Sequence, residues 1–172
     1  MIDQEMNRES LIGAFEQLRG VITSVDDAIV FLRNENLKKD NSVRLIAWLV
    51  FLRLIPEQEE SRISSVYQMI LNYESFVEKE LGPNRDTPLN AVDMKIGNVI
   101  LADVDRSIDS FKKSAAILKQ TEYNTKYARE HAIRILTILS LTGLPYIQGY
   151  DRYIFTCYLI ALEFASKCCL PP

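Results

Sequence analysis

The sequence predicts an all-α protein, built as an irregular multi-helix bundle. Apolar residues recur at intervals of three and four along most of the chain, which is the spacing of one helix face. Segments that alternate apolar and polar residues, as strands do, are scarce, and the chain has only 6 glycines. At 172 residues it is the size of one domain, so we expect a single helical domain over residues 1–172.

The first two helices are predicted from an apolar face and from a capping residue. Four apolar side chains at helical spacing define the first face: Leu11, Phe15, Leu18 and Ile22. Gly20 interrupts this face. Ser24, followed by Asp26 and Asp27, is typical of an N-cap with acids in the first helical turn. The polar stretch 34–41 is then expected to be a loop.

A central helix and a long amphipathic helix are predicted next. Ser42 is expected to cap a helix that is apolar nearly all round and that Pro56 ends. Trp48 has so many apolar neighbours there that we place it in the core. From Ile63 to Leu81 the apolar positions again form a helical stripe, and the following Gly-Pro pair stops it.

The second half of the chain predicts three more helical segments. Residues 83–88 read as a loop, either a plain connector or a place where a partner makes contact. An apolar stripe then resumes at four positions: Val92, Ile96, Val99 and Ile100. Another helix is expected from Tyr127 to Leu139. Gly143 and Pro145 break the chain before a last helix over 149–167.

Composition argues against several classes of function. A net charge of −3 and a pI near 5.3 provide no excess of positive charge for nucleic acid or for an acidic membrane surface. The apolar run 153–162 is about half the roughly 20 residues that cross a bilayer, so we expect a buried helix there. With one histidine, His131, we expect no metal site, and that residue is expected to be an ordinary packed or edge histidine rather than a general base.

The cysteines and the lack of a phosphate loop add two expectations. Cys157, Cys168 and Cys169 form an odd set crowded at one end, which suits a reducing compartment such as the cytoplasm. We expect them to be small core residues rather than nucleophiles. Because no glycine-rich phosphate loop is present, we expect no nucleotide or other cofactor bound by the chain itself.

Two polar stretches, 100–107 and 142–152, interrupt apolar segments, and we expect their functional side chains at segment boundaries. Arginine and glutamine are the notable residues, because a guanidinium neutralises phosphate charge and a glutamine amide can hold an attacking water. Simpler interpretations also fit. Asp103 and Arg106, three apart, could be a surface ion pair. Gln148 could serve the first turn of the last helix, and Tyr146 could be a core residue.

At this point the residues resemble those of TBC domains. Ile100-x-x-Asp103-x-x-Arg106-Ser107 is similar to the signature I-x-x-D-x-x-R-T, and Tyr146-x-Gln148-Gly149 matches Y-x-Q-G. Arg44-x-x-x-Trp48 also looks like the R-x-x-x-W element near the start of that domain. The three motifs occur in the family's order, and the resemblance covers about residues 41–167, the N-terminal part of a TBC domain.

The resemblance implies a GTPase-activating protein for a Rab-type small GTPase, acting in vesicle trafficking. Arg106 would be the arginine finger and Gln148 the glutamine finger. Asp103 would orient Arg106, Tyr146 would pack beside Gln148, and Gly149 would let the chain pass closely. Arg44 and Trp48 would be structural. GTP and Mg²⁺ would be bound by the partner GTPase, which would also bring this cytoplasmic protein to endomembranes.

The sequence departs from the family pattern in three ways, of which the first is mild and the other two favour an alternative. Ser107 replaces threonine, Tyr150-Asp151 replaces the common Met-Asn pair, and the sequence ends about one helix after Y-x-Q-G, where TBC domains continue. The alternative is a non-catalytic TBC-like helical adaptor that binds a GTPase or another protein without stimulating hydrolysis. A third interpretation is an unrelated helical bundle. The sequence names neither the Rab nor an oligomeric state.

Overall fold

A computed structural model describes residues 13, 15–34, 41–117 and 127–167. Throughout these ranges the regular structure is helical, with no strand, which confirms the predicted all-α class. The elements are α2 (Val25–Arg33), α3 (Asn41–Phe51), α4 (Glu59–Leu81), η2 (Gly82–Asn84), η3 (Pro88–Ala91), α5 (Met94–Ile117), α7 (Ala128–Leu141) and α8 (Tyr150–Lys167). Contacts group the chain into two compact units, residues 1–70 with 160–172 and residues 71–159, which we call unit 1 and unit 2.

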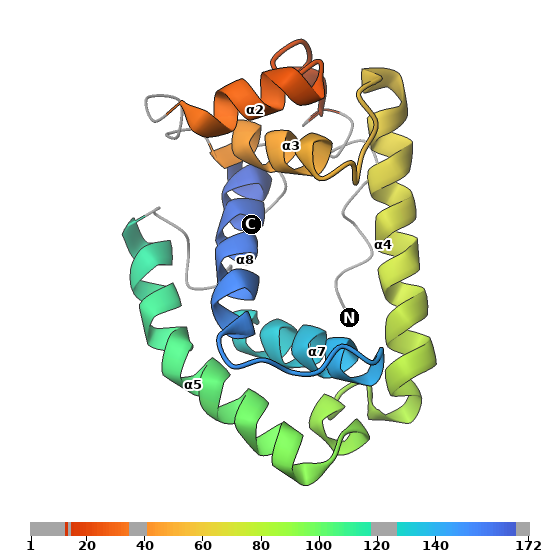
Figure 1. Cartoon of the computed structure of the whole chain (residues 1–172), viewed down its shortest axis with the longest axis vertical. Coiled ribbons are helices and arrows are strands. Elements are labelled where there is room, and N and C mark those ends of the chain that lie inside the picture. The colour runs from red at the N-terminus through yellow and green to blue at the C-terminus, as the bar shows by residue number, and fades with distance from the viewer. Residues whose placement is uncertain (1–12, 14, 35–40, 118–126, 168–172) are drawn as a thin grey trace. The chain divides into compact units, whose positions relative to one another are not determined.

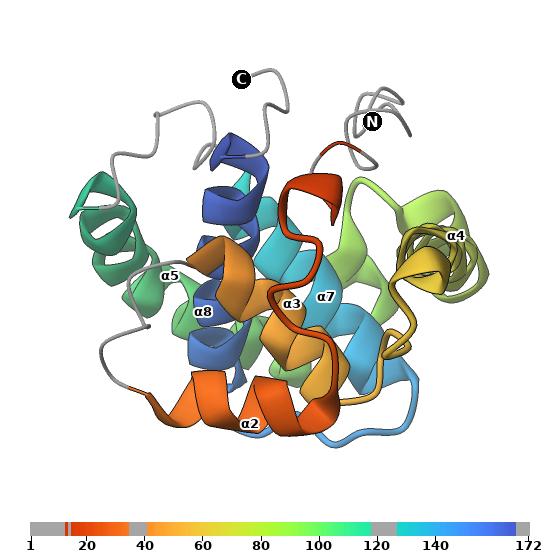
Figure 2. The same ribbon diagram turned by 90° about the horizontal axis from the view of Figure 1, so that it is seen from above.

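In unit 1 the two neighbouring helices α2 and α3 lie side by side (Figures 1 and 2). The N-cap prediction for α2 is confirmed, because the Ser24 hydroxyl accepts a hydrogen bond of 3.1 Å from the amide of Asp27. The carboxylate of Asp27 in turn accepts from the Thr23 amide at 3.0 Å. These reciprocal bonds fix the point at which the chain enters α2.

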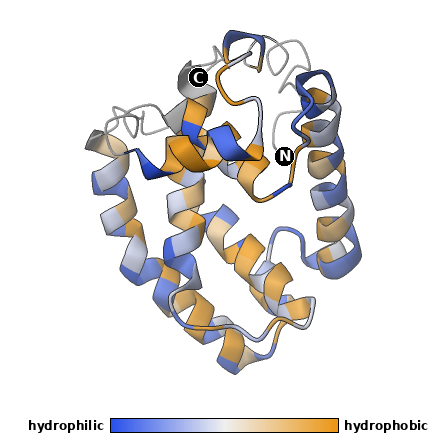
Figure 3. Ribbon diagram, turned by 45° about the horizontal axis from the view of Figure 1, so that its top comes forward, coloured by the Kyte–Doolittle hydropathy of each residue, from blue (hydrophilic) through white to orange (hydrophobic). Residues whose placement is uncertain are grey.

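The core of unit 1 forms where α3 packs against α2 and the segments around them. Its buried apolar residues are Phe15, Ile22, Ala28, Phe31, Val43, Ile46, Ala47, Val50, Ile55 and Phe164. The rings of Phe15 and Phe164 meet edge to face, with centroids 5.9 Å apart. Helix α3 is largely apolar along its length, as the sequence predicted, whereas most helices in Figure 3 carry blue hydrophilic as well as orange hydrophobic residues. Ile22, however, is buried outside a helix, because residues 18–21 form a turn around Gly20, whose φ is +77°.

The end of α3 differs from the prediction. The helix ends at Phe51, well before Pro56, in a left-handed turn at Arg53, whose φ is +56°. The amide of Leu54 bonds back to the Leu49 carbonyl at 2.9 Å, and that of Arg53 to the Val50 carbonyl at 2.9 Å, the pattern of a Schellman cap. The expected N-cap is also wrong, since Ser42 lies inside α3.

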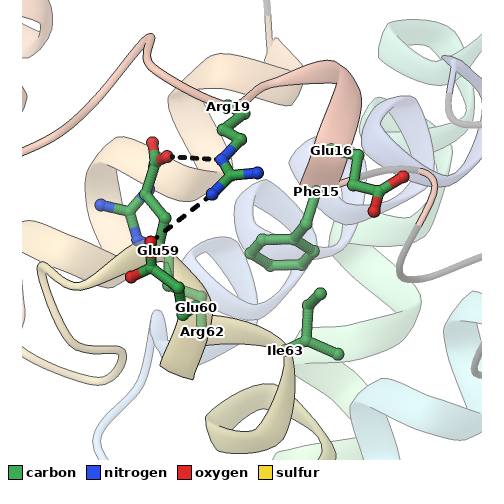
Figure 4. A pocket seen from close by; sticks show the side chains of 7 residues that line it. All are labelled: Phe15, Glu16, Arg19, Glu59, Glu60, Arg62 and Ile63. Atoms are coloured by element: carbon green, nitrogen blue, oxygen red, sulfur yellow. Dashed lines mark hydrogen bonds and ion pairs between the residues drawn. The ribbon is translucent and has the colours of Figure 1, made fainter.

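A buried arginine at the start of α4 holds the surrounding turns together. Arg62, with 2% of its surface exposed, donates to the carbonyls of Ile22 at 2.6 Å, Glu57 at 2.9 Å and Pro56 at 3.1 Å. It also lies 3.6 Å from the carboxylate of Glu59 (Figure 4). Three carbonyls that no helix satisfies therefore share one guanidinium, whose fork of five donors suits this task.

Unit 2 contains the second part of α4 and then η2, η3, α5, α7 and the first part of α8. Helix α7 contacts both α5 and η3, as Figure 1 shows. Buried apolar side chains come from each of these long helices: Val77, Leu81, Ile100, Val104, Phe111, Leu136, Ile138 and Phe155. The expected apolar stripe at the start of α5 is only partly correct, because Ile96 and Val99 are 39% and 44% exposed.

The left-handed conformation at Arg53 predicts a stabilising substitution. Glycine adopts positive φ without the steric penalty of a side chain, which is about 1 kcal/mol. We therefore expect Arg53→Gly to raise the free energy of unfolding by up to about 1 kcal/mol, as measured by urea titration. Arg53→Ala is the matched control and should give no such gain, since it keeps a Cβ at the strained position. Equal effects of the two substitutions would contradict this explanation.

A second prediction concerns Arg62. Replacing it with methionine keeps much of the side-chain volume but leaves three carbonyls without this donor and removes one of the partners of Glu59. We expect Arg62→Met to lower the free energy of unfolding by about 3 kcal/mol. The exposed Arg33→Met is the control, for which the change should stay below about 0.5 kcal/mol. Similar urea midpoints for both variants would show that the buried guanidinium does not stabilise unit 1.

Candidate functional site

The candidate site in unit 2 is organised around one buried carboxylate. Asp103, in the middle of α5, has only 2% of its surface exposed. It accepts a hydrogen bond of 2.8 Å from the hydroxyl of Tyr146 at Oδ2. At its other oxygen, Oδ1, it meets the guanidinium of Arg106 at 3.1 Å and the amide nitrogen of Gln148 at 3.4 Å. Four of the residues predicted to act together therefore do come together.

Helix geometry explains the first of these contacts. Asp103 and Arg106 are three residues apart, so α5 presents both on one face. The expected position of Arg106 at a segment boundary is wrong, because α5 runs without interruption from Met94 to Ile117. The arginine thus projects from a rigid helix rather than from a loop. Its side chain is 60% exposed, although its partner is buried.

The other two donors come from the connection between α7 and α8. Helix α7 ends at Leu141, and α8 begins at Tyr150, so Tyr146 and Gln148 lie on the intervening segment (Figure 1). Tyr146 is half-buried, with its ring 6.2 Å from that of Tyr150 in an edge-to-face arrangement. Gln148 is exposed. The segment is therefore anchored through Tyr146 while its glutamine stays at the surface.

Gly149 has a structural reason to be glycine at this place. Its φ is +102°, in a region that residues with a side chain rarely adopt. A Cβ built on it meets no atom within 4 Å, so the requirement comes from the backbone and not from a close neighbour. The expectation that Gly149 lets the chain pass closely stays a prediction. Within this protein, the residue turns the segment from Gln148 into α8.

Electrostatics reinforces the bond between Tyr146 and Asp103. Burial, the hydrogen bond to Asp103 and the charges of Asp103 and Asp151 all raise the pKa of Tyr146 well above its ordinary value, with Arg106 acting in the opposite direction. The phenol therefore keeps its proton and remains a donor throughout the physiological range. This makes Tyr146 a fixed support for the carboxylate and not an acid–base group.

A second contact lies directly beside the first and was not predicted. The hydroxyl of Ser107 on α5 donates to the carboxylate of Asp151 in the first turn of α8. Asp151 has 2% of its surface exposed. The sequence noted both residues only as departures from the family pattern. An acid in a first helical turn suggests a cap, but no local signal reveals that its partner lies on α5.

The surface beside the cluster carries apolar side chains. Leu144 and Ile147 on the α7–α8 connection are 53% and 54% exposed, and Tyr153 on α8 is 73% exposed. These three residues flank Gln148 in sequence. Exposed apolar residues next to a polar cluster are common where proteins dock.

The remaining predicted residues lie elsewhere. Arg44 and Trp48 are both on α3 in unit 1, outside the unit that holds the cluster. Arg44 is half-buried, and the structural role that the resemblance implies for it stays a prediction. The placement of Trp48 in the core is wrong, since 38% of its surface is exposed. The reason is that α3 buries one face through Ile46, Ala47 and Val50, while Trp48 lies on another.

The lone histidine and the first cysteine take no part in this cluster. His131 on α7 is half-buried, with Nδ1 3.1 Å from the hydroxyl of Tyr158, and burial lowers its pKa. It is thus the packed histidine that was expected. Cys157 was expected in the core but is exposed. The predictions for Cys168 and Cys169 lie outside the described residues.

Two hollows occur away from the cluster. One, of about 440 Å³, is lined in unit 2 by residues 86–90 and by the start of α7, including Arg129 and Arg134. This is the segment that the sequence marked as a connector or a partner contact. The other, of about 180 Å³ in unit 1, is lined by paired charges, and in Figure 4 Arg19 points to Glu59 and Glu60.

The described residues contain neither a cluster of metal ligands nor a membrane-spanning helix. No group of three or more metal-ligating side chains comes together in the described part of the chain. Among the helices that the structure describes, none is both long and apolar enough to cross a membrane.

Comparison with known proteins adds no family to these observations. No protein-family model matches the chain, and neither a curated protein nor a solved structure gives a significant match. The resemblance to TBC domains therefore depends on the three short motifs alone.

The hydrogen bond of Tyr146 predicts a pH-dependent contribution to stability. Because the pKa of Tyr146 is higher in the folded than in the unfolded chain, its contribution is complete below about pH 10 and is lost as the pH rises beyond that value. At pH 7 we expect Tyr146→Phe to lower the free energy of unfolding by about 1–2 kcal/mol. The difference from wild type should shrink above about pH 10.

Urea titrations at neutral and at alkaline pH measure this effect. Tyr153→Phe is the matched control, since that tyrosine is 73% exposed, and its difference from wild type should stay near zero at every pH. A destabilisation by Tyr146→Phe that is equally large at pH 7 and pH 11 would contradict a role for the hydroxyl proton.

Proposed function

We propose that the protein activates a Rab-type small GTPase by supplying Arg106 and Gln148 in trans to GTP bound on the GTPase. One observation supports this most directly: both side chains contact the same oxygen of Asp103, at 3.1 Å and 3.4 Å. The contacting nitrogens of Arg106 and Gln148 are therefore separated by no more than the sum of these two distances. The pair can therefore serve one phosphoryl group and its attacking water.

Hydrolysis of GTP needs neutralisation of charge on the transferring phosphoryl group and placement of a water in line with it. Arg106 has five donors, of which the bond to Asp103 uses one side of the fork, and its side chain is 60% exposed. The remaining N–H groups can reach phosphate oxygens. Asp103 thereby acts as a positioning residue that holds one nitrogen of the guanidinium.

Gln148 suits the second task for a similar reason. Its amide nitrogen contacts Asp103, while its exposed side chain also offers a carbonyl oxygen that can accept from a water. A glutamine whose amide nitrogen is hydrogen-bonded is preorganised to position a water, because its rotamer does not have to be fixed during the reaction. Tyr146 supports the same carboxylate from the protein side.

The partner that this arrangement fits is a GTPase that carries GTP and Mg²⁺ itself. The apolar residues Leu144, Ile147 and Tyr153 provide a surface on which such a protein can rest beside the two fingers. Contact with membranes then follows from the GTPase, which places the protein in the cytoplasm at the surface of endomembranes during vesicle trafficking.

A second candidate function is a non-catalytic adaptor that binds a GTPase or another protein without turnover. One observation favours it. Asp103 and Asp151 are both buried carboxylates, and Asp103 pairs with the exposed guanidinium of Arg106, so part of the positive charge of Arg106 is already compensated. A phosphate would approach it less readily than an uncompensated arginine.

Phosphate release from a panel of GTP-loaded Rab GTPases tests the catalytic proposal. We expect the wild-type chain to accelerate at least one of them. Because an arginine finger contributes roughly 10³–10⁵ in rate, Arg106→Ala should abolish most of the stimulation. Arg106→Lys should recover little, since lysine lacks the planar fork. We expect Gln148→Ala to be impaired as well.

The control uses a neighbouring ion pair of the same chemistry. Arg129 on α7 binds Asp105 on α5 at 2.7 Å, and neither residue contacts Gln148. Arg129→Ala should leave stimulation unchanged. If the wild type accelerates none of the Rabs, the catalytic proposal fails. Nucleotide-dependent capture of a Rab without acceleration would then support the adaptor.

A further inference from the structure

The contact between Ser107 and Asp151 lies next to both proposed fingers. Ser107 directly follows Arg106 on α5, and Asp151 lies in the first turn of α8, just after Gln148 and Gly149. The hydroxyl of Ser107 donates to the Asp151 carboxylate, which has 2% of its surface exposed. This bond therefore joins the helix that carries one finger to the helix start that follows the other.

Burial makes this bond energetically important. An aspartate near a helix N-terminus is favoured by the unsatisfied amides and the helix dipole. A carboxylate taken out of water nevertheless needs donors, and loss of one costs more than loss of an exposed contact. Ser107 supplies a donor across the gap between the two helices. The start of α8 is thus tied to the middle of α5.

The apolar packing between α5 and α8 does not by itself set the position of the first turn of α8, so the Ser107–Asp151 hydrogen bond does. Phe111 on α5 meets Phe155 at 5.0 Å and Tyr158 at 5.8 Å between ring centroids, so the next turns of α8 rest on an apolar contact with α5. Apolar ring contacts are less directional than a charge-assisted hydrogen bond. The Ser107–Asp151 bond fixes where α8 begins.

The segment that carries Gln148 is consequently held at both ends. Tyr146 anchors it to Asp103 on one side, and Asp151 anchors the start of α8 to Ser107 on the other. Between them Gly149, at φ +102°, is the position with the least restricted backbone. Release of either anchor would let Gln148 move relative to Arg106.

We propose that Ser107 and Asp151 form a clasp that positions Gln148 opposite Arg106. This inference uses the proposed function for its kinetic consequence, but the clasp itself can be measured without it. Both residues are positioning residues, because neither is placed to touch the phosphate. A displacement of about 1 Å at a reacting group can reduce the rate by on the order of 100-fold, so the clasp matters although it is remote from the chemistry.

The first experiment measures amide hydrogen exchange over residues 142–149 by mass spectrometry. We expect Ser107→Ala and Asp151→Asn each to speed exchange there by about tenfold or more, because the anchor of α8 is weakened. The double variant should exchange no faster than the more affected single one, since both substitutions remove the same bond. Ser107→Thr, which keeps the hydroxyl, should restore the wild-type rate.

The control is Ser110→Ala, a substitution of an exposed serine on the same helix, which should leave exchange over 142–149 unchanged. Unchanged exchange in Ser107→Ala would overturn the clasp whatever the outcome with Rab GTPases. So would an equal increase over every segment of unit 2, because that result indicates general destabilisation.

The second experiment measures stimulated GTP hydrolysis with a responsive Rab. Ser107→Ala should lower kcat by about 10- to 100-fold with little change in KM, and Ser107→Thr should recover it. In a Gln148→Ala background, Ser107→Ala should cause no further loss, because the residue it positions is already absent. An equal loss in both backgrounds would overturn the positioning role. If no Rab responds to the wild type, the proposed function fails, and the exchange experiment alone decides on the clasp.

Discussion

The carboxylate of Asp103 is the constraint on which the rest of unit 2 depends. A charge that is almost fully buried in a helical bundle must be surrounded by donors, because its solvation by water has been lost. Arg106 is provided by the same helix, but the hydroxyl and the amide come from a distant connection. The path of the α7–α8 connection is therefore a consequence of satisfying Asp103. The exposure of Arg106 and Gln148 follows from the same requirement, since each uses only part of its hydrogen-bonding capacity inward.

In unit 1 the buried charge is positive, and it satisfies acceptors instead of donors. There the turns around α2 and α4 leave carbonyl groups that no helix satisfies, and the guanidinium of Arg62 donates to three of them. In both units one buried ionic group gathers segments that are far apart in sequence. The difference is that Arg62 directs all its contacts inward, whereas the cluster around Asp103 leaves polar groups at the surface. The second arrangement therefore keeps the exposed side chains of Arg106 and Gln148 at the surface.

Short-range sequence patterns correctly predicted the features that depend on neighbouring residues in the chain. The cap at Ser24, the end of α4 before Gly82 and the break at Gly143 were all read correctly from short-range signals. The spacing of Asp103 and Arg106 likewise allowed their ion pair to be considered. Errors arose where tertiary packing decides. Trp48 and Ile96 look like core residues by composition, yet each helix buries only the face that meets a neighbour.

In the candidate site, too, the sequence predicted local features but not the contacts that depend on tertiary packing. The sequence brought Tyr146 and Gln148 into consideration only through a resemblance, because nothing local links them to Asp103. The bond from Ser107 to Asp151 could not be predicted, since it requires knowledge of how α5 packs against α8. The closure of α3 at Arg53 was missed for another reason. Glycine normally marks a left-handed cap, and an arginine in that conformation gives no such signal.

The long separation along the chain between Asp103 and its donors has a consequence for folding. Tyr146 and Gln148 lie 43 and 45 residues beyond Asp103, so the loop between them must close before either bond can form. Contacts of this kind form slowly, because the chain loses entropy before it gains the interaction. During synthesis α5 emerges long before the segment that satisfies its buried acid. The cluster is thus completed only when the beginning of α8 has docked, and its assembly reports that unit 2 has reached its native topology.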